Sequence, residues 1–428
     1  MASSRTAASP ASDDRAYVRG ARILSIGIAS TGLFTFLFFA VAGHALDHDG
    51  YGRVSLLWSV LFIVMSVLYR PVEQLLSRTI AARRARGAVG GHPLRTPATI
   101  QAGFAAAFLV AALVLREPIT DDLFDGKQAL YWILVASALA YAASYFARGY
   151  LAGHQMFGFY GGLVLFESIT RFCFPVAVVA GLLSGEAWVA AGILAAPLAS
   201  LLVVPWALRL HHRAHAEEER PREDAEDRLG GSARFAGSVA LIQLSEQALL
   251  NVAVLLVADA ATAGLVFSAL LIARAPLQLF QAIQTSLLPH LASLEATEGK
   301  QAFARAIRQT LLAIAGFAGL AALGLLAIGP WVMELVFDAQ EGVYGRIGLV
   351  VIAVGMGLHL SAGTLNQAAL ARGYAHQAAA AWLLAAGAFV AWMLLPVVGD
   401  ELLRAETGYA GAAALLCALL YALYRAGR

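Results

Sequence analysis

The sequence predicts an all-α polytopic membrane protein, with about twelve transmembrane helices in two parallel six-helix pseudo-repeats around a central cleft. Three observations lead to this fold class. Hydrophobic residues make up 60% of the 428 residues and charged residues only 14%, a composition that excludes a soluble globular domain. The apolar residues gather in long runs, and one strongly hydrophilic segment divides the chain near its middle.

The apolar runs are long enough to cross a hydrocarbon core about 30 Å thick, which takes about 20 helical residues. The first run can span and has no small-residue cleavage pattern behind it, so we expect a retained helix rather than a signal peptide. Cys173 and Cys417 both fall inside predicted helices, which argues against a disulfide framework. The predicted helices are 23–43, 55–76, 99–115, 129–149, 159–181, 187–208, 235–257, 263–288, 307–329, 347–370, 377–397 and 408–425.

The distribution of Lys and Arg between the loops sets the predicted orientation. If the N-terminal tail lies in the cytoplasm, most of the 30 Lys and Arg residues fall in tails and loops on the cytoplasmic side. The positive-inside rule therefore predicts that both termini are cytoplasmic. Arg171 and Arg274 fall inside helices. The basic residues predicted on the opposite side are Arg53, Arg116, Lys127, Arg346 and Arg404.

The hydrophilic segment at the middle of the chain reads as a charged cytoplasmic linker between two bundles. A gapless offset of about 212 residues also pairs positions at the start of each half, which indicates an internal repeat. The predicted domains are a cytoplasmic N-terminal tail at 1–22, an N-terminal bundle at 23–210, the linker at 211–233 and a C-terminal bundle at 234–428. The matched pairs are Ala21 and Arg22 with Ala233 and Arg234, Asp47 with Asp259, Gly52 with Gly264, Val54 with Val266, and Leu75 and Leu76 with Leu287 and Leu288.

A second match supports the repeat. ARGYLAGHQ, from Ala147 to Gln155, recurs as ARGYAHQ, from Ala371 to Gln377, at the turn between the fourth and fifth predicted helices of each half. An even number of helices per half makes the repeats parallel, with a cleft between the bundles. This geometry favours transport by alternating access, in which one bundle rocks against the other.

Four stretches of the chain carry a family resemblance. They are HDGYGRVSL at 48–56, YRPVEQLLSR at the end of the second helix, the ARGYLAGHQ turn, and LIARAPLQLFQAIQTSLLPHLA in the eighth helix. Together they resemble the polysaccharide exporter branch of the multidrug/oligosaccharidyl-lipid/polysaccharide exporter superfamily, over nearly the whole chain after Arg22. The resemblance implies a flippase of the bacterial inner membrane that moves a polyprenyl-pyrophosphate-linked oligosaccharide from the cytoplasmic to the outer leaflet, for cell-surface polysaccharide biosynthesis. The implied partners are this lipid-linked oligosaccharide, membrane lipid and a coupling cation, either a proton or sodium.

Such a substrate needs cations and hydrogen-bonding groups in a wet cleft, and Arg suits phosphate because its planar fork binds in a bidentate way. Glu246 and Arg274 lie at equal sequence distance from the turn near residue 260, so an antiparallel hairpin places both at one depth, roughly 20 Å from the turn. The same pair could equally be a structural ion pair between two helices. The polar residues that continue the two stripes are Gln278 and Gln281 beside Arg274, and Gln243 and Gln247 beside Glu246.

Other charged residues have a functional and a structural interpretation. Arg148 and Arg372 end pseudo-equivalent helices and could bind the pyrophosphate, or serve as interfacial anchors. Glu167 and Arg171, one turn apart, are expected to form a salt bridge within one helix. His359 lies in mid-helix and, like Glu246, is a candidate for coupling to a proton, although a packing histidine is more common.

Two other function classes stay open. A drug or organic-cation antiporter of the same superfamily would need an acidic residue, which Glu246 could supply, although the helix at 23–43 contains no acid. A membrane glycosyltransferase or polymerase is disfavoured because the longest outer segments, 116–128 and 330–346, are short for a catalytic acid pair.

The sequence therefore predicts no enzyme and no cofactor. It contains no Walker A motif, which argues against ATP hydrolysis. His211, His212 and His215 have a helix-compatible spacing but lie in the charged linker, so we expect no metal site there. We expect no nucleic-acid partner.

Overall fold

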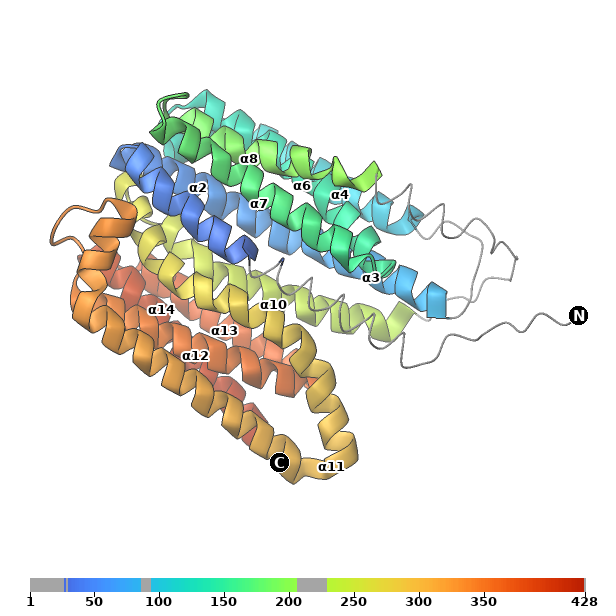
Figure 1. Ribbon diagram of the computed structural model, residues 1–428. Coiled ribbons are helices and arrows are strands. Elements are labelled where there is room, and N and C mark those ends of the chain that lie inside the picture. Colours follow the sequence, from blue (N-terminus) through green and yellow to red (C-terminus); the bar gives the residue numbers. More distant parts are fainter. Residues whose placement is uncertain (1–26, 28–29, 86–93, 206–228, 427–428) are drawn as a thin grey trace, which may run out of the picture.

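The computed structural model is an all-helical, multi-pass membrane protein, as the sequence predicts (Figure 1). It describes residue 27 and residues 30–85, 94–205 and 229–426, and for 229–236 and 273–300 only the helical course is described. No strand occurs in these ranges. After an apolar helix at Ser30–Ala45, the elements are α2 (His48–Val64), the π-helix η1 (Met65–Tyr69), α3 (Arg70–Ala85), α4 (Arg95–Val114), α5 (Arg116–Pro118), the π-helix η2 (Ile119–Leu123), α6 (Gln128–Gly153), α7 (Phe157–Val179), α8 (Glu186–Ser200), α10 (Leu229–Leu255), α11 (Ala260–Phe337), α12 (Arg346–Ala371), α13 (Ala375–Leu394) and α14 (Glu401–Ala426).

The membrane spans agree with those expected from hydropathy. Among the described residues, 10 helices are long and apolar enough to cross a membrane. Two shorter apolar helices, Ser30–Ala45 and Ala260–Ile272, coincide with the first and eighth predicted spans. Every predicted span therefore has a helix at its position.

The helices pack in two groups, which are consecutive in sequence (Figure 1). The first group runs from the Ser30–Ala45 helix to α8 and the second from α10 to α14, and we call them the N bundle and the C bundle. They contact each other mainly through α2 against α10 and α11. The predicted tail at 1–22 and most of the predicted linker at 211–233 lie outside the described residues.

Successive helices alternate in direction, so the molecule has two ends. One end carries Asp47, Asp125 and Asp259, and we call it the Asp47 end. The other carries Arg148 and Arg372, and we call it the Arg148 end. The sequence predicts that the Arg148 end is cytoplasmic.

The internal repeat is visible at the start of the second helix of each bundle. Asp47 caps α2 by accepting a hydrogen bond from the backbone N–H of Gly50, and Asp259 caps α11 by accepting one from the N–H of Thr262. These aspartates are one of the pairs that the sequence offset matches. Glu186 and Glu401 likewise both begin the last helix of their bundle.

The long helix α11 differs from the predicted hairpin of two helices joined by a loop. Its 78 residues run from the Asp47 end and return to it, and the connection stays helical (Figure 1). The physical reason is composition, because the stretch between the two predicted spans is rich in Ala, Leu, Glu, Lys and Gln, which favour helix.

A π-helical segment interrupts the second span. In η1, the N–H of Arg70 bonds to the carbonyl of Met65, and Pro71 follows directly. Proline has no N–H to donate and clashes with the preceding turn, which a wider π turn accommodates. The segment fixes the direction in which Arg70 leaves the helix.

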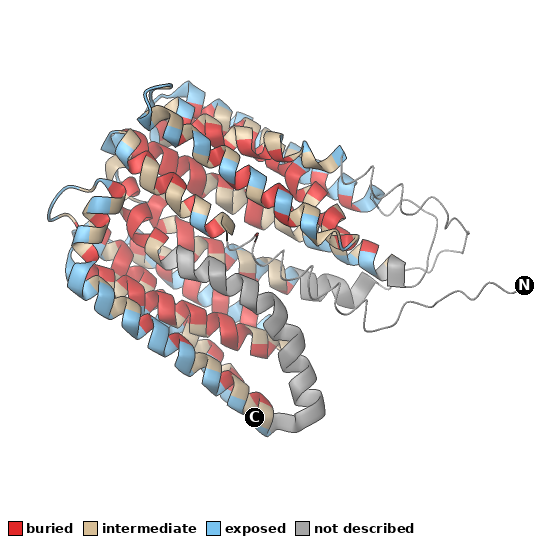
Figure 2. Ribbon diagram, in the orientation of Figure 1, coloured by how far each residue is buried: buried red, intermediate tan, exposed pale blue. Residues whose placement is uncertain are grey.

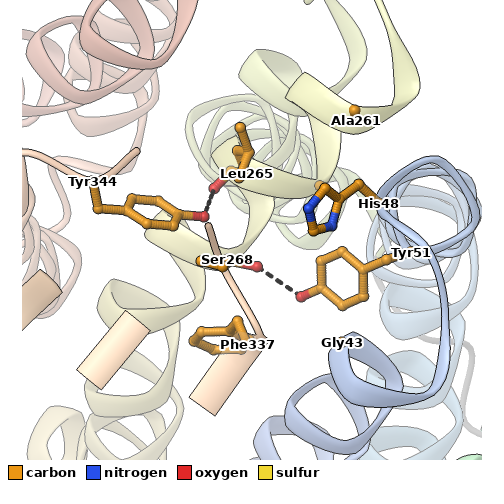
Figure 3. Close-up of a pocket in the computed structure, with 10 residues that line it drawn as sticks. Gly43, His48, Tyr51, Ala261, Leu265, Ser268, Phe337 and Tyr344 are labelled. Carbon is orange, nitrogen blue, oxygen red and sulfur yellow. Dashed lines mark hydrogen bonds between the residues drawn. The ribbon is translucent and has the colours of Figure 1, made fainter. Parts of the chain in front are cut away.

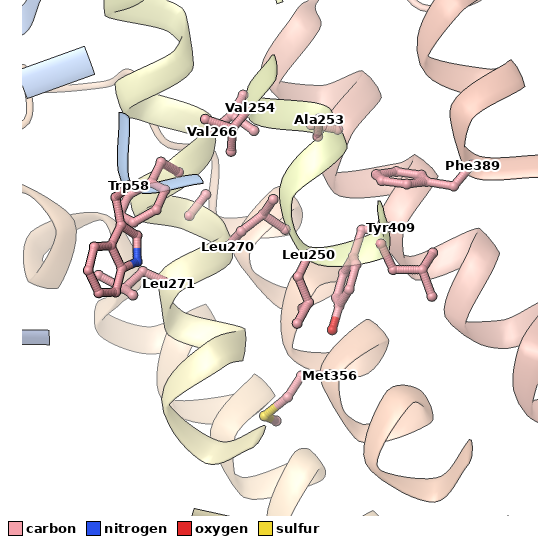
Figure 4. Packing of buried hydrophobic residues seen from close by; sticks show 14 of the residues in the cluster. Trp58, Leu250, Ala253, Val254, Val266, Leu270, Leu271, Met356, Phe389 and Tyr409 are labelled. Carbon is pink, nitrogen blue, oxygen red and sulfur yellow. The ribbon is translucent and has the colours of Figure 1, made fainter. Parts of the chain in front are cut away.

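The buried core lies between the bundles and within each of them, whereas exposed positions face outward (Figure 2). Close to the contact between bundles, the rings of Phe39 and Phe267 have centroids 4.4 Å apart. Trp58, Leu270 and Leu271 pack there as well, and Tyr409 and Phe389 continue the cluster into the C bundle (Figure 4). Large apolar side chains on the outside, such as Leu320 at 72% exposed, are expected to face lipid.

Candidate functional site

The two bundles touch closely at the Asp47 end (Figure 3). Gly52 of α2 faces the carbonyl of Ala260, and a Cβ at position 52 would overlap with that oxygen. A Cβ at Gly264 would lie 2.9 Å from the Tyr51 ring, so the matched glycines of the two repeats meet across the interface. The Tyr51 hydroxyl and the Ser268 hydroxyl share a hydrogen bond of 2.7 Å. We call Tyr51, Gly52, Ala260, Gly264 and Ser268 the closure contact.

Further contacts at this end surround a small pocket (Figure 3). Gly43 lies against the carbonyl of Phe337, to which a Cβ would approach within 2.7 Å. His48 and Gln340 contact each other through their side-chain nitrogens at 3.1 Å. The Tyr344 hydroxyl donates to the carbonyl of Leu265 at 2.9 Å. The Asp47 end of the structure is therefore closed.

The bundles also meet through polar groups deeper in the molecule. Arg70 of α3 donates a hydrogen bond of 3.4 Å to the side-chain oxygen of Gln243 in α10. Gln243 in turn donates to Glu246 at 2.9 Å. A guanidinium, an amide and a carboxylate thus form one connected row across the interface.

The N bundle also contains an ion pair that links α6 and α7. Arg148 donates to the Glu167 carboxylate at 2.7 Å, and both side chains are almost buried, at 11% and 7% exposed. Ser144 donates to the same carboxylate oxygen at 3.3 Å. The Arg148 guanidinium also lies 4.4 Å from the centre of the Tyr145 ring. Arg148 is therefore a buried, paired cation rather than an exposed side chain at the membrane interface.

This pairing corrects two sequence expectations. Glu167 was expected to bond Arg171 one turn along its helix, whereas the structure pairs it with Arg148 of the neighbouring helix. The sequence places Glu73 between Arg70 and Arg78 as their local partner, whereas the Glu73 carboxylate accepts a hydrogen bond of 2.5 Å from the Tyr160 hydroxyl. In both cases a neighbouring helix places a donor closer than the local residue can reach.

Arg171 is fully buried, at 2% exposed, in a site of hydroxyls and rings. It donates to the Thr35 hydroxyl at 2.8 Å and to the Tyr141 hydroxyl at 3.5 Å. Its guanidinium also lies 4.5 Å from the centre of the Trp58 ring. Among the described residues, no carboxylate lies within 4.0 Å of Arg171.

The C bundle also holds the sequence candidates His359 and Arg372. His359 is buried, and its Nδ1 is 3.3 Å from the Tyr409 hydroxyl, while its ring packs edge-on against Trp382. Arg372 ends α12 and lies over the rings of Phe303 at 4.3 Å and Tyr424 at 5.4 Å. This cation–π contact ties three helices together at the Arg148 end.

The polar stripes predicted on the helices at 235–257 and 263–288 are only partly described by the structure. Gln247 is buried, and its side-chain oxygen accepts from Asn251 at 3.1 Å. Arg274, Gln278 and Gln281 belong to α11, but their side chains lie outside the described part of the chain, so the pairing of Arg274 with Glu246 stays a prediction.

Arg70 and Glu406 are functional candidates that sequence reasoning did not select. Arg70 carries a signal that could have been used, because it precedes a proline inside a span. Glu406 falls just outside the predicted last span, where an acid attracts no notice. Within the described residues, no group of three or more His, Cys, Asp and Glu side chains could hold a metal ion.

The comparisons with known proteins rest on structure. No protein-family model matches the chain, and no curated protein matches its sequence. An inward-facing multidrug resistance MATE family transporter of the MOP superfamily superposes with a TM-score of 0.65 at 14% identity, over 95% of this chain and 97% of the other. The chain has the fold of the MATE transporters.

Two other solved structures share this fold over almost the full length of both chains. The Vibrio cholerae MATE transporter VcmN matches with a TM-score of 0.64 at 16% identity, over 96% of each chain. A MOP superfamily transporter from Pyrococcus furiosus, described as having a binding pocket of reverse polarity, matches with a TM-score of 0.66 at 15% identity, over 96% of this chain and 95% of the other. The MATE fold thus occurs with binding pockets of different polarity.

Proposed function

We propose that the protein is a membrane transporter that flips a polyprenyl-pyrophosphate-linked oligosaccharide from the cytoplasmic to the outer leaflet by alternating access. The two-bundle MATE fold supports transport, because the solved structures that share it are transporters. The sequence resemblance to polysaccharide exporters supports the substrate. The proposed location is the bacterial inner membrane, with both termini in the cytoplasm.

The observation that carries the substrate class is the balance of deep charges in the N bundle. The deep cations of this bundle are Arg70, Arg148 and Arg171, and its deep carboxylates are those of Glu73 and Glu167. Glu167 is neutralised by Arg148, and Glu73 is hydrogen-bonded by Tyr160. The N bundle therefore offers arginines in excess, which suits an anionic pyrophosphate better than a cationic drug.

Arg70 is the arginine best placed to meet a substrate. It lies where the N bundle faces α10, and its hydrogen bond to Gln243 is long at 3.4 Å. A phosphate oxygen is a stronger acceptor than an amide oxygen, so a pyrophosphate entering between the bundles would compete for this guanidinium. Gln243 would then be released to bind the glycan.

The closed Asp47 end fits one state of such a cycle. With the Asp47 end outside, as the loop charges predict, the closure contact shuts the path to the outer leaflet. One of the structural relatives is described as inward-facing. The substrate would therefore enter from the cytoplasmic side in the state that the structure represents.

A drug or organic-cation antiporter is the second candidate, and one observation favours it. Glu246 is a half-buried carboxylate in α10 at the contact between the bundles, a position from which it could meet a cation. The relative described as a multidrug resistance transporter shows that the fold serves that function elsewhere.

Deletion of the gene in its native bacterium tests the two functions against each other. The flippase proposal predicts loss of surface glycan and accumulation of its lipid-linked precursor on the cytoplasmic leaflet. Complementation with the wild-type gene should restore the glycan, and Arg70→Ala should not, provided that the variant reaches the membrane in normal amount. Unchanged surface glycan together with increased sensitivity to toxic cations would contradict the flippase and support the antiporter.

A further inference from the structure

Glu406 is a buried carboxyl group with no cationic partner among the side chains that the structure describes. It lies in the second turn of α14 and is 3% exposed. Its Oε1 has no hydrogen-bond partner, and no Lys, Arg or His of the described residues lies within 4.0 Å of its carboxylate. The nearby Arg404 is turned away, toward Glu401 at 3.0 Å. A carboxylate is costly to bury in such a place, so the site is unusual.

The packing of α12 on α14 makes room for this group. Gly348 of α12 faces Glu406, and a Cβ at position 348 would overlap with both carboxyl oxygens. One turn beyond Glu406, Tyr409 packs against Gly355, where a Cβ would approach its ring within 3.0 Å. The carboxyl group therefore packs directly against the backbone of α12.

Glu406 is connected to the closure contact through the loop that precedes α12. Tyr344, in the loop between α11 and α12, lies four residues before Gly348, which faces Glu406, and its hydroxyl donates to the carbonyl of Leu265, the neighbour of Gly264 in the closure contact. Burial raises the pKa of Tyr344 well above its usual range, and the charges of Tyr51 and Glu406 raise this pKa further. The tyrosine is thus a neutral hydrogen-bond donor to the helix that carries Gly264 and Ser268 of the closure contact (Figure 3).

Few other titratable groups act on Glu406. On its own helix and the loop before it, Asp400 acts by its charge, and Glu401 is occupied by Arg404. The loop before α12 contributes Tyr344. In α12, the residue that faces Glu406 is Gly348, which has no titratable side chain, and the titratable His359 lies three turns further on. The neighbouring part of α13 contributes Trp392, which does not titrate and donates to the carbonyl of Arg404. No group in this set could compensate an ionised Glu406.

We propose that Glu406 is a proton-binding site whose protonation state controls the closure contact between the two bundles. The protonated carboxyl fits the closed Asp47 end. When its proton passes to water, the ionised carboxylate needs hydration that the closed packing cannot give, and the bundles part at this end. The proposal rests on the proposed transport function in one respect, since it makes a proton the coupling ion, and it assigns a site that differs from Glu246 and His359.

Distance measurements in lipid nanodiscs test the proposal without any substrate. Spin labels on Leu182→Cys and Val397→Cys, two exposed loop positions at the Asp47 end of different bundles, report how far the bundles are apart. Cys173 and Cys417 are first replaced by alanine. Distance distributions are then recorded across a pH series for the unchanged background, for Glu406→Gln, and for Glu341→Gln, which removes an exposed carboxylate near the same end.

We expect the longer distances to gain population as pH rises in the background and in Glu341→Gln. Glu406→Gln should keep the short distances at every pH, because its amide cannot ionise. Glu406→Asp should keep the pH dependence with a shifted midpoint, which separates loss of the proton from loss of the fold. A pH dependence that persists unchanged in Glu406→Gln would overturn the proposal, as would its absence in the background. If surface glycan does not depend on the protein while these distances follow Glu406, the substrate is wrong and the proton site stands.

Discussion

Arg148 on α6 and Glu167 on α7 share a hydrogen bond of 2.7 Å in the interior of the N bundle. The pair joins two adjacent helices at a depth where neither charge reaches bulk water. It also neutralises one of the two deep carboxylates of the bundle, which leaves Arg70 and Arg171 against the single carboxylate of Glu73. Four predictions follow from this arrangement of charges and from the closure contact.

Removing one partner of the Arg148–Glu167 pair should destabilise the protein. Arg148→Ala leaves a buried carboxylate without its cation, which costs about 3–5 kcal/mol of unfolding free energy. The double variant Arg148→Gln with Glu167→Gln should recover a large part of this loss, because no uncompensated charge stays buried. Thermal unfolding of the purified protein measures both, and Arg78→Ala, at an exposed position of α3, is the control. Equal unfolding temperatures for Arg148→Ala and Arg78→Ala would contradict the prediction.

A side chain at Gly52 should open the closure contact. Gly52→Ala places a Cβ where the Ala260 carbonyl oxygen lies, so the bundles cannot approach as closely. We expect a cysteine at position 268, where the native Ser268 is 1% exposed, to react with a polar thiol reagent about tenfold faster, which corresponds to about 1.4 kcal/mol. Gly103→Ala is the matched control, because a Cβ there meets nothing within 4 Å. An unchanged labelling rate in Gly52→Ala would show that the contact is not tight.

The bond between Arg70 and Gln243 should matter for transport more than for stability. A single long hydrogen bond contributes about 1 kcal/mol or less to folding. Arg70→Lys keeps the charge but loses the planar fork that binds phosphate in a bidentate way, so flipping should fall severalfold while unfolding changes little. Flipping of a fluorescent lipid-linked oligosaccharide in proteoliposomes measures this, with Gln74→Ala, an exposed position on the same helix, as control. If Arg70→Lys flips at the normal rate, the guanidinium fork has no part in substrate binding.

Substitution of Arg171 tests whether its guanidinium serves transport or only the stability of the fold. Arg171→Met has a similar length and no charge, so it should leave the protein as stable or more stable, because a desolvated charge is removed. If Arg171 helps to attract the pyrophosphate, flipping should nevertheless fall by about tenfold. Unfolding temperature and flipping rate are measured on the same preparation, beside Thr35→Val, which removes only one hydrogen-bond partner. A stable Arg171→Met protein with full flipping activity would exclude this arginine from transport.

Much of the fold was predictable because a membrane imposes its constraints locally along the chain. Every span could be located from hydropathy, since each helix satisfies its own backbone within one continuous segment. The repeat was predictable too, because Asp47 and Asp259 cap their helices through residues only three positions away. The helical connection within α11 was missed, because a polar stretch of good helix formers resembles a loop in hydropathy.

The partners of the charged side chains were decided by tertiary structure. In sequence, Glu167 has Arg171 one turn away, and only the packing of α6 on α7 brings Arg148 to it. Gly52 and Gly264 could be matched as repeat positions, yet their meeting depends on how one bundle docks on the other. Spans and caps follow from interactions within a few residues, whereas ion pairs and bundle contacts join residues far apart in the chain, so only the folded packing selects among the partners that composition allows.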